Sequence, residues 1–434
     1  MPEPTRIKPK DRDLILQALR AGVVPRLGLQ HIQVGRAREV EEMVRDVERI
    51  GQGGAAIRFV IGEYGTGKTF FLNLARLIAL EKKLVVINAD LAPDRRLHAS
   101  GGQARSLYSE LLRNMATRTR PEGGALASVV ERFIGDVHKD AKAGGHSVED
   151  LVQERLAPLQ DLVAGYDFTT VLTHYWRASE DGNEPGKAAA LCWLRAEYST
   201  RTEARQALGV RDIIDDASFY DYLKLLARFV TIAGYDGLLV VLDEMVNLYK
   251  LTSVQARSSN YEQILRILND VLQGSAENVG FLLGGTPEFL MDPRRGLYSY
   301  PALQSRLAEN RFVRDGLVDL SGPVIRLQNL MPEDLYVLLR NLRHVHAGGD
   351  PARHAVPDEA LTAFMNHCSS RIGDAYFRTP RNTVTEFVSL LSVLEQNPGT
   401  PWQSLLGTIM PAIDVPPPDT IPDGDDDDLT SFKL

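Results

Sequence analysis

Short apolar segments alternate with longer amphipathic segments over most of the chain. Four of the short segments are nearly continuous runs of apolar residues, a pattern typical of strands buried on both faces of a parallel sheet. They are Ile57–Ile61, Leu84–Asn88, Gly237–Asp243 and Val279–Gly284. In the longer segments, such as Glu39–Ile50 and Thr69–Glu81, apolar residues recur at helical spacing, which predicts amphipathic helices. Strands separated by helices imply parallel crossovers, so we expect a three-layer α/β fold.

The stretch between the second and third predicted strands is unusually long for one crossover. Its pattern predicts helices that are interrupted by Gly- and Pro-containing breaks. The predicted helices are Ser106–Thr117, Ala125–Val137, Val148–Leu162, Ala188–Glu203 and Phe219–Ala233. We therefore expect an inserted helical subdomain at about residues 91–236, and we expect partners to bind there.

The loop between the first predicted strand and the following helix matches the pattern G-x-x-x-x-G-K-[ST] in full. Its residues are Gly62, Glu63, Tyr64, Gly65, Thr66, Gly67, Lys68 and Thr69. Glycines let the backbone wrap around phosphate oxygens, and N–H groups at the helix N-terminus point at the anion. Lys68 would bring a positive charge to the β- and γ-phosphates, and the Thr69 hydroxyl would ligate Mg²⁺. The loop therefore predicts a binding site for ATP and Mg²⁺.

The third predicted strand ends in two acidic residues, Asp243 and Glu244. A buried parallel strand delivers such side chains to its carboxyl end, where open α/β sheets bind their ligands. Asp243 would hold Mg²⁺, directly or through water. Glu244 would polarise the attacking water as general base. Combined with the P-loop, this pair predicts an ATPase.

The order of the motifs resembles that of AAA+ P-loop ATPases. The resemblance implies that Thr286, after the fourth strand, faces the γ-phosphate and the catalytic water; a strand-to-loop turn is the alternative. It also implies that Arg306 is an arginine finger for the nucleotide of a neighbouring subunit. Arg311 and Arg314 are substitutes for this role, and solvated helix faces would equally explain all three arginines.

Two further segments carry the same resemblance. Val34, Gly35 and Arg36 are similar to the segment that packs beside the adenine in initiator-type AAA+ proteins; the alternative is a surface turn before a helix. Arg381 follows Pro380, which suits the first turn of a helix, and it resembles the lid arginine that senses the γ-phosphate. Arg378 is the alternate sensor, and a surface salt bridge is the structural alternative for both arginines.

The chain resembles one group of AAA+ ATPases in particular, the BREX-type phage-defence ATP-binding proteins of the BrxC/BrxD-like group. The resemblance rests on Ile61–Phe71, on the long helical stretch, and on Phe281–Pro287, and it covers roughly residues 25–400. It implies a setting in prokaryotic antiviral defence or DNA transactions. It further implies a homo-oligomeric ring or filament and partner proteins such as a helicase or a nuclease.

These motifs divide the chain into four parts. Residues 1–33 are expected to be a helical lead-in, and residues 34–322 an AAA+ ATPase core with the helical insertion. Residues 323–410 are expected to be a helical lid domain, and residues 411–434 a disordered acidic tail that carries Asp425–Asp428. The tail accounts for part of the net charge of −8. It is either a solvated terminus or a docking peptide for a basic partner.

The composition argues against a membrane-spanning protein and against a secreted one. Apolar residues make up 44% of the sequence, but their longest runs have the length of strands and fall short of a membrane span. The first twelve residues are polar and charged, unlike a signal peptide. We therefore expect a cytoplasmic protein without membrane contact.

Two functions are consistent with the motifs. In the first, ATP hydrolysis drives or switches a DNA-directed multi-protein machine; in the second, ATP controls protein assembly without DNA binding. DNA binding would need a basic stripe on one face, and solvated helix faces are the alternative explanation for the available arginines. These are Arg95, Arg96, Arg105, Arg113, Arg118 and Arg120.

Overall fold

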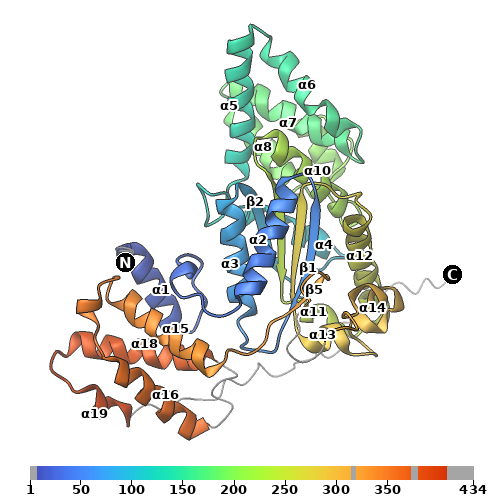
Figure 1. Ribbon diagram of the computed structural model, residues 1–434. Helices are drawn as coiled ribbons and strands as arrows, with labels where there is room; N and C mark the ends of the chain where they lie inside the picture. Colours follow the sequence, from blue (N-terminus) through green and yellow to red (C-terminus); the bar gives the residue numbers. More distant parts are fainter. Residues whose placement is uncertain (1–6, 314–318, 373–379, 408–434) are drawn as a thin grey trace.

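The computed structural model describes residues 7–313, 319–372 and 380–407 of the 434-residue chain. Within these ranges the centre is a sheet of five strands in the order β2-β3-β4-β1-β5 (Figure 1). The strands are β1 (Ala55–Ile61), β2 (Leu84–Asp90), β3 (Gly237–Asp243), β4 (Val279–Gly285) and β5 (Val324–Arg326). All neighbouring pairs are parallel, so the carboxyl ends of the strands lie at one edge. The predicted α/β class with a parallel sheet is confirmed.

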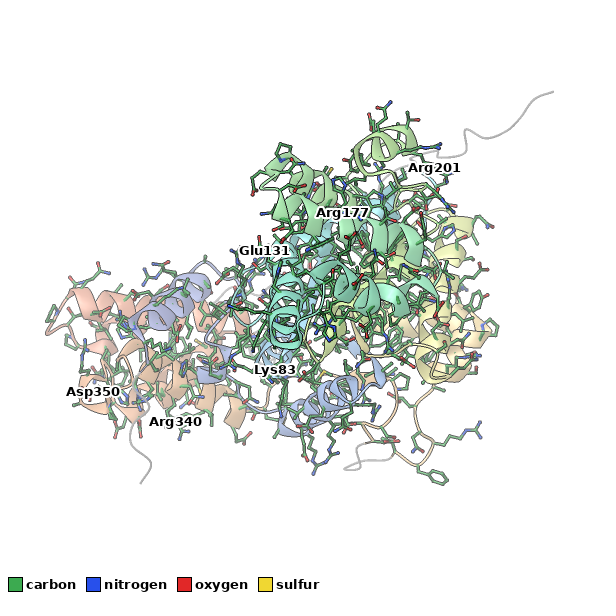
Figure 2. All side chains as sticks on the ribbon, turned by 90° about the horizontal axis from the view of Figure 1, so that it is seen from above. Lys83, Glu131, Arg177, Arg201, Arg340 and Asp350 are labelled. Atoms are coloured by element: carbon green, nitrogen blue, oxygen red, sulfur yellow. The ribbon has the colours of Figure 1, made fainter. Side chains whose placement is uncertain are left out.

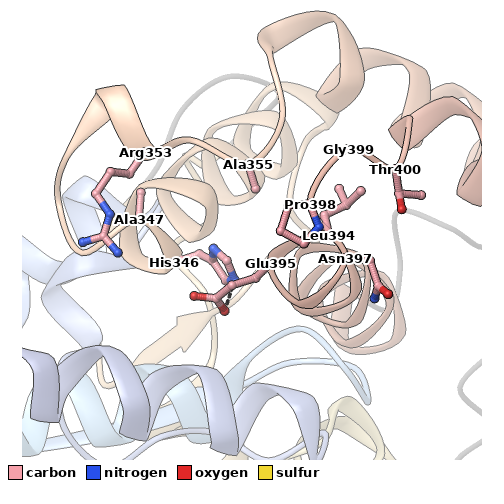
Figure 3. Close-up of a pocket in the computed structure, with 10 residues that line it drawn as sticks. All are labelled: His346, Ala347, Arg353, Ala355, Leu394, Glu395, Asn397, Pro398, Gly399 and Thr400. Carbon is pink, nitrogen blue, oxygen red and sulfur yellow. Dashed lines mark ion pairs between the residues drawn. The ribbon is translucent and has the colours of Figure 1, made fainter.

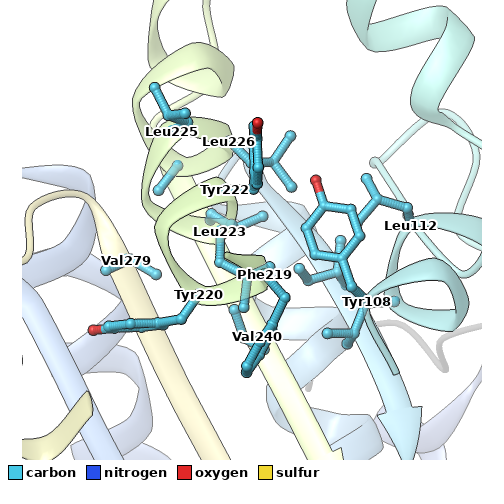
Figure 4. Packing of buried hydrophobic residues seen from close by; sticks show 14 of the residues in the cluster. Tyr108, Leu112, Phe219, Tyr220, Tyr222, Leu223, Leu225, Leu226, Val240 and Val279 are labelled. Atoms are coloured by element: carbon cyan, nitrogen blue, oxygen red, sulfur yellow. The ribbon is translucent and has the colours of Figure 1, made fainter. Parts of the chain in front are cut away.

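Helices cover both faces of the sheet because its strands are apolar on both sides. Val60 and Val241 pack with the helices of one face, whereas Phe59 and Val240 pack with those of the other. The first face carries α2 (Ala37–Gly51) and α3 (Lys68–Glu81). The second face carries α4 (Gln103–Arg113), α10 (Phe219–Ile232) and α12 (Val254–Leu272). Figure 4 shows Tyr108 and Leu112 of α4 and the aromatic residues of α10 packed beside Val240.

Five more helices lie between α4 and α10 in this continuously described stretch. They are α5 (Leu126–Gly144), α6 (Val148–Gln160), α7 (Gly165–Glu180), α8 (Glu184–Leu194) and α9 (Arg201–Leu208). They extend beyond the end of the sheet that is opposite to the P-loop (Figure 1). Their buried residues, including Phe133, Phe168 and Trp193, belong to the same apolar core as the second face of the sheet.

Two of these helices differ from the sequence-based expectation. The helix α7 was not predicted, because its β-branched and aromatic residues are weak helix formers; burial of Phe168, Val171 and Trp176 stabilises it instead. The predicted helix Ala188–Glu203 is wrong as a single element, because the chain leaves the helical conformation after Leu194. A new helix, α9, starts after its N-cap Thr200, whose hydroxyl accepts a hydrogen bond from Glu203 N.

The C-terminal helices form a second cluster together with the N-terminal helix. The elements are α1 (Pro9–Arg20), η1 (Leu29–His31), α15 (Pro332–His346), η3 (Pro351–Arg353), α16 (Asp358–Ile372), α18 (Pro380–Gln396) and α19 (Trp402–Leu406). The hydroxyl of Thr385 in α18 donates to the carbonyl of Leu19 in α1 at 2.9 Å. Figure 2 shows this cluster, with Arg340 and Asp350 labelled, beside the sheet and its helices. The first helix therefore packs with the last part of the chain.

Short elements complete the sheet edge. They are α11 (Val246–Tyr249), α13 (Pro287–Met291), η2 (Leu297–Ser299) and α14 (Pro301–Leu307). The strand β5 lies just after residue 322 and pairs with β1, so residues 324–326 belong to the sheet.

The expected tail 411–434, Arg314 and Arg378 lie outside the described residues. In the described parts of the chain, no helix is both long and apolar enough to span a membrane.

Candidate functional site

The P-loop joins the carboxyl end of β1 to the amino end of α3. Gly65 and Gly67 have φ values of 84° and 87°, in the left-handed region that favours glycine. A Cβ atom added to Gly62 would lie 2.5 Å from Oγ1 of Thr66, which is closer than real side chains approach. The glycines therefore permit a tight loop whose N–H groups can surround an anion at the start of a helix.

Lys68 lies in this loop with its ammonium group held by the backbone. Its Nζ donates to the carbonyl oxygens of Gly62 at 2.8 Å and of Glu63 at 2.9 Å. Burial lowers the pKa of Lys68, and the nearby carboxylates of Asp243 and Glu244 partly offset this effect. A bound polyphosphate would compensate this partly desolvated positive charge.

The acidic pair meets the P-loop, as the spacing of the motifs predicts. The hydroxyl of Thr69 donates to Oδ2 of Asp243 at 2.9 Å, although the two residues are 174 positions apart. The other carboxylate oxygen of Asp243 accepts a hydrogen bond from the backbone N of Glu244 at 2.9 Å. Glu244 has φ of 58°, an uncommon conformation for a residue with a side chain. The loop, the metal-ligand candidates and the base candidate thus form one site.

A glycine in β4 leaves room for Asp243. A Cβ atom on Gly284 would lie 2.4 Å from Oδ1 of Asp243 and 2.8 Å from Cδ1 of Leu72. The carboxylate can take its observed position only because the neighbouring strand has no side chain there. The Gly-Gly pair at the end of β4 is the sequence signal for this role.

Asp90 is a third carboxylate at this edge, and the sequence-based prediction missed it. The strand β2 continues to Asp90, which pairs in register with Asp243. Burial and then the charge of Asp243 raise the pKa of Asp90. Glu244 reaches solvent on one side, yet burial and then the charges of Asp243 and Asp90 raise its pKa. The signal for Asp90 was the extension of the second apolar run beyond Asn88 to an acidic residue.

The segment with Val34, Gly35 and Arg36 lies beside the P-loop. Arg36 donates through Nη2 to the carbonyl of Thr66 at 2.5 Å and to that of Gln328 at 3.0 Å. Gly35 has φ of 59° and lies against the carboxylate of Asp334, which a Cβ atom would approach to 3.2 Å. Val34 packs on the cluster of C-terminal helices. The segment thus connects the P-loop, the chain after β5, and α15.

Arg381 also reaches the P-loop. Its Nη1 lies 3.3 Å from the hydroxyl of Tyr64, and its Nε would lie 3.2 Å from a Cβ atom on Gly22. Arg381 is the second residue of α18, so this helix starts at the phosphate-binding loop. The expected sensor position therefore contacts a side chain of the P-loop.

Thr286 lies at the carboxyl end of β4, at the same edge of the sheet as the P-loop and Asp243. The backbone N of Gly62 donates to the carbonyl of Gly285 at 3.2 Å, which fixes this neighbourhood. The Thr286 hydroxyl accepts a hydrogen bond from Phe289 N at 3.4 Å and caps α13. The side chain thus has a structural contact at the place where the resemblance expects a catalytic one.

The observed hydrogen bond of Arg306 lies within its own helix and does not involve the P-loop. Its Nη1 donates to the carbonyl of Ala302, one turn earlier in α14, at 2.8 Å. Arg311 is exposed in the following segment. Among the described contacts, neither arginine touches residues 62–69 of the same chain.

Several of the arginines considered for DNA contact face carboxylates. The ion pairs are Arg95–Glu110 at 3.6 Å, Arg113–Glu197 at 3.1 Å and Arg118–Glu81 at 3.4 Å. Arg105 donates to the carbonyl of Tyr198 at 3.5 Å. Paired cations attract a phosphate backbone less than free ones do, so these contacts weaken the case for a basic stripe.

The residues of the site fit ATP with Mg²⁺. Lys68 and the N–H groups of residues 62–69 suit phosphate oxygens, and the hydroxyl and carboxylate of Thr69 and Asp243 suit a hard cation. In the described chain, no group of three or more His, Cys, Asp or Glu side chains is arranged to hold a metal.

A cavity of about 350 Å³ lies elsewhere, among the C-terminal helices (Figure 3). His346 and Glu395 face each other in its wall at 3.2 Å, and Arg353 lies at its rim. The predicted site residues are absent from its lining, so the cavity is separate from the P-loop site.

Comparison with known proteins places the chain in a family. No curated protein matches the sequence. The family model described as "BREX system ATP-binding protein BrxC/D" matches residues 7–409, nearly the whole chain. Membership implies ATP binding and a place in phage defence. The chain belongs to the BrxC/D family of BREX system ATP-binding proteins.

Proposed function

We propose that the protein hydrolyses ATP in the site formed by the P-loop and the acidic pair. Lys68 and the loop N–H groups bind the phosphates and stabilise their charge. Thr69 and Asp243 would hold Mg²⁺, which supplies further charge neutralisation and orients the γ-phosphate. Glu244 accepts a proton from the attacking water, and burial, which raises its pKa, makes it a stronger base than a carboxylate in water.

The contact between Thr69 and Asp243 carries this proposal. Two motifs that lie 174 residues apart meet at 2.9 Å, with the oxygen atoms that P-loop ATPases use for Mg²⁺. A chance match of a glycine-rich turn would not bring an acidic strand end to the hydroxyl next to its lysine.

We assign further roles around this centre. Thr286 contacts the γ-phosphate and the water, Arg381 moves from Tyr64 to the γ-phosphate, and the Val34–Arg36 segment borders the adenine. Arg306 acts on the nucleotide of a neighbouring copy in a homo-oligomer. In this scheme residues 91–236 are an inserted partner-binding subdomain, and the C-terminal helices are a lid.

Hydrolysis at this site drives or switches a DNA-directed defence machine, with partners such as a helicase or a nuclease. A second candidate is an ATP-controlled assembly switch that does not bind DNA. The ion pairs of Arg95, Arg113 and Arg118 favour this candidate, because they reduce the positive potential of that surface.

ATP turnover by wild type and by Glu244→Gln tests the proposal. The variant should bind ATP and lose turnover by about 10²–10⁴-fold, the usual contribution of a positioned base. Glu288→Gln is the matched control, because Glu288 also acts electrostatically on Lys68 but is assigned no catalytic role. Equal turnover by Glu244→Gln and wild type would reject Glu244 as the base.

ATP turnover, measured with and without DNA, separates the two candidate functions. A DNA-directed machine should hydrolyse ATP faster with DNA, and the effect should weaken as salt is added. Turnover that does not respond to DNA at low salt supports the assembly switch.

A further inference from the structure

The short helix after Glu244 is fastened to the segment that leads to Arg306. Met245 follows Glu244 and donates its backbone N to the carbonyl of Gly284 at 3.0 Å. The helix α11 follows and ends at Tyr249. The amide of Asn247 donates to the carbonyl of Leu91 at 2.8 Å, so α11 is also anchored beside β2. Contacts to β4 and to the residue after β2 therefore hold α11 directly after Glu244.

Arg295 holds the carboxyl end of α11. Its Nη2 donates to the carbonyl oxygens of Tyr249 and Leu251, both at 3.1 Å, and its guanidinium lies 5.3 Å from the centre of the Tyr249 ring. The carbonyl oxygen of Arg295 accepts a hydrogen bond from the hydroxyl of Tyr261 at 2.6 Å. Both side-chain hydrogen bonds come from Nη2, while the planar guanidinium lies against the Tyr249 ring; a lysine at this position would lack the planar group that makes this combination of contacts.

Asp292 fixes the turn from which Arg295 projects. One oxygen of its carboxylate accepts from the backbone N of Arg294 at 2.7 Å and of Arg295 at 3.1 Å. The other oxygen accepts from the Tyr249 hydroxyl at 3.0 Å. Gly296 closes the turn, and a Cβ atom there would lie 2.6 Å from the carbonyl of Glu288. Asp292 and Arg295, which both lie in this turn, thus both contact Tyr249 at the carboxyl end of α11.

The same turn continues directly into the helix of Arg306. The element η2 begins at Leu297, one residue after Gly296, and α14 begins at Pro301. The hydroxyl of Tyr298 donates to the carbonyl of Leu307 at the end of α14 at 3.1 Å. Hydrogen bonds and the chain itself therefore connect α11 to α14, at its amino end through residues 297–300 and at its carboxyl end through Tyr298.

We propose that Arg295 and Asp292, together with Tyr249, are positioning residues that couple the nucleotide state at Glu244 to the placement of α14 and Arg306. When ATP changes the backbone around Glu244, α11 moves, and the clamp on Tyr249 and Leu251 carries this movement to residues 297–307. In an oligomer each subunit thereby reports its own nucleotide to the site of its neighbour. This inference rests on the proposed ATP site. It adds a route by which the nucleotide in one subunit affects the site of the next subunit.

Hydrogen exchange of the backbone amides, with and without ATP and Mg²⁺, tests the coupling. The protein with Glu244→Gln serves as the reference, because it should hold ATP without turnover. ATP should slow exchange at residues 62–69 and also change exchange at residues 297–307. Adding Arg295→Lys should abolish the change at 297–307 and leave the change at 62–69 in place. Arg294→Lys is the matched control, because this exposed neighbour should leave both changes intact.

The outcomes separate the coupling from the proposed function. If ATP changes exchange at 62–69 but not at 297–307, or if Arg295→Lys retains both changes, the coupling is refuted. If ATP changes neither segment and does not bind, the proposed function fails instead. Tyr249→Phe removes only the hydroxyl that bonds Asp292, and it should weaken the change at 297–307 even if Arg295→Lys proves unstable.

Discussion

The three carboxylates at the carboxyl edge of the sheet have distinct environments. Asp243 is engaged by the Thr69 hydroxyl and by a backbone N–H, which suits a metal ligand. Glu244 reaches solvent, and its raised pKa suits a base that must take up a proton. Asp90 adds negative charge next to both. The division of roles at this edge therefore depends first on burial and hydrogen bonding, and then on the neighbouring like charges.

We predict that Asp90→Asn shifts the acid limb of the pH–rate profile to lower pH. The charge of Asp90 raises the pKa of Glu244, so its removal lowers that pKa. Glu244 then stays ionised, and active as a base, to a lower pH. The measurement is kcat for ATP against pH, with Glu110→Gln as control, because the charge of Glu110 raises the pKa of Asp90 whereas the carboxylates that raise the pKa of Glu244 are Asp243 and Asp90. An acid limb that stays in place or moves upward would contradict this assignment.

At the residue scale, motifs with fixed local spacing could be predicted, and contacts set by strand register could not. The P-loop and the pair Asp243 and Glu244 are contiguous in sequence, so their chemistry is readable directly. Asp90 and Gly284 acquire their roles only because β2 and β4 pair with β3 in one register. An acidic residue or a glycine at a strand end is too common to reveal such a role alone.

At the scale of elements, a buried ion pair fastens α2 to β1. Arg58 in β1 is 3% exposed, and its Nε and Nη2 donate to the two oxygens of Asp46 in α2 at 2.5 and 3.0 Å. Its Nη1 donates to the carbonyl of Leu320 at 2.5 Å, so the same side chain also holds the chain before β5. Both charges are satisfied in a setting from which water is largely excluded.

We predict that Arg58→Met lowers the free energy of unfolding by about 3–5 kcal/mol, because it removes both of its hydrogen bonds to the buried Asp46 carboxylate. Arg49→Met is the matched control: Arg49 is exposed and lies 3.6 Å from the same carboxylate, so its loss should cost less than about 1 kcal/mol. Urea denaturation of the two variants checks this. A similar loss of unfolding free energy in both variants would show that burial does not set the contribution of the Arg58–Asp46 pair to stability.

The elements themselves were predictable where their pattern was strong. Four strands and most long helices follow from apolar periodicity. The short β5 was not predicted, because only three residues pair and their burial comes from the sheet. The break between α8 and α9 was missed because the intervening residues, 195–200, interrupt no clear periodicity.

On the scale of the whole molecule, distant parts of the chain converge on the P-loop. The N-terminal helix packs with α18, the helix that begins beside Tyr64. The segment at Arg36 joins the same loop to the chain after β5. The described part of the lead-in expected at residues 1–33 is therefore in contact with the C-terminal helices through α1, a proximity that no local sequence pattern contains.

We predict that two inactive variants restore activity when they are mixed. Arg306→Ala should lower turnover by about 10³-fold or more, as expected for an arginine finger, and wild-type turnover per subunit should rise with concentration. In a mixture, a Glu244→Gln subunit supplies Arg306 to an Arg306→Ala subunit that retains Glu244. Arg311→Ala is the control and should remain active. Turnover independent of concentration, with no recovery on mixing, would show that Arg306 does not act between subunits.

The most direct measurement is the equilibrium binding of ATP, with Mg²⁺ present, to Lys68→Ala. The account predicts that wild type and the control Lys82→Ala, altered at an exposed lysine after α3, bind ATP, whereas Lys68→Ala loses binding. An unchanged ATP affinity in Lys68→Ala would contradict the assignment of the P-loop as the phosphate site.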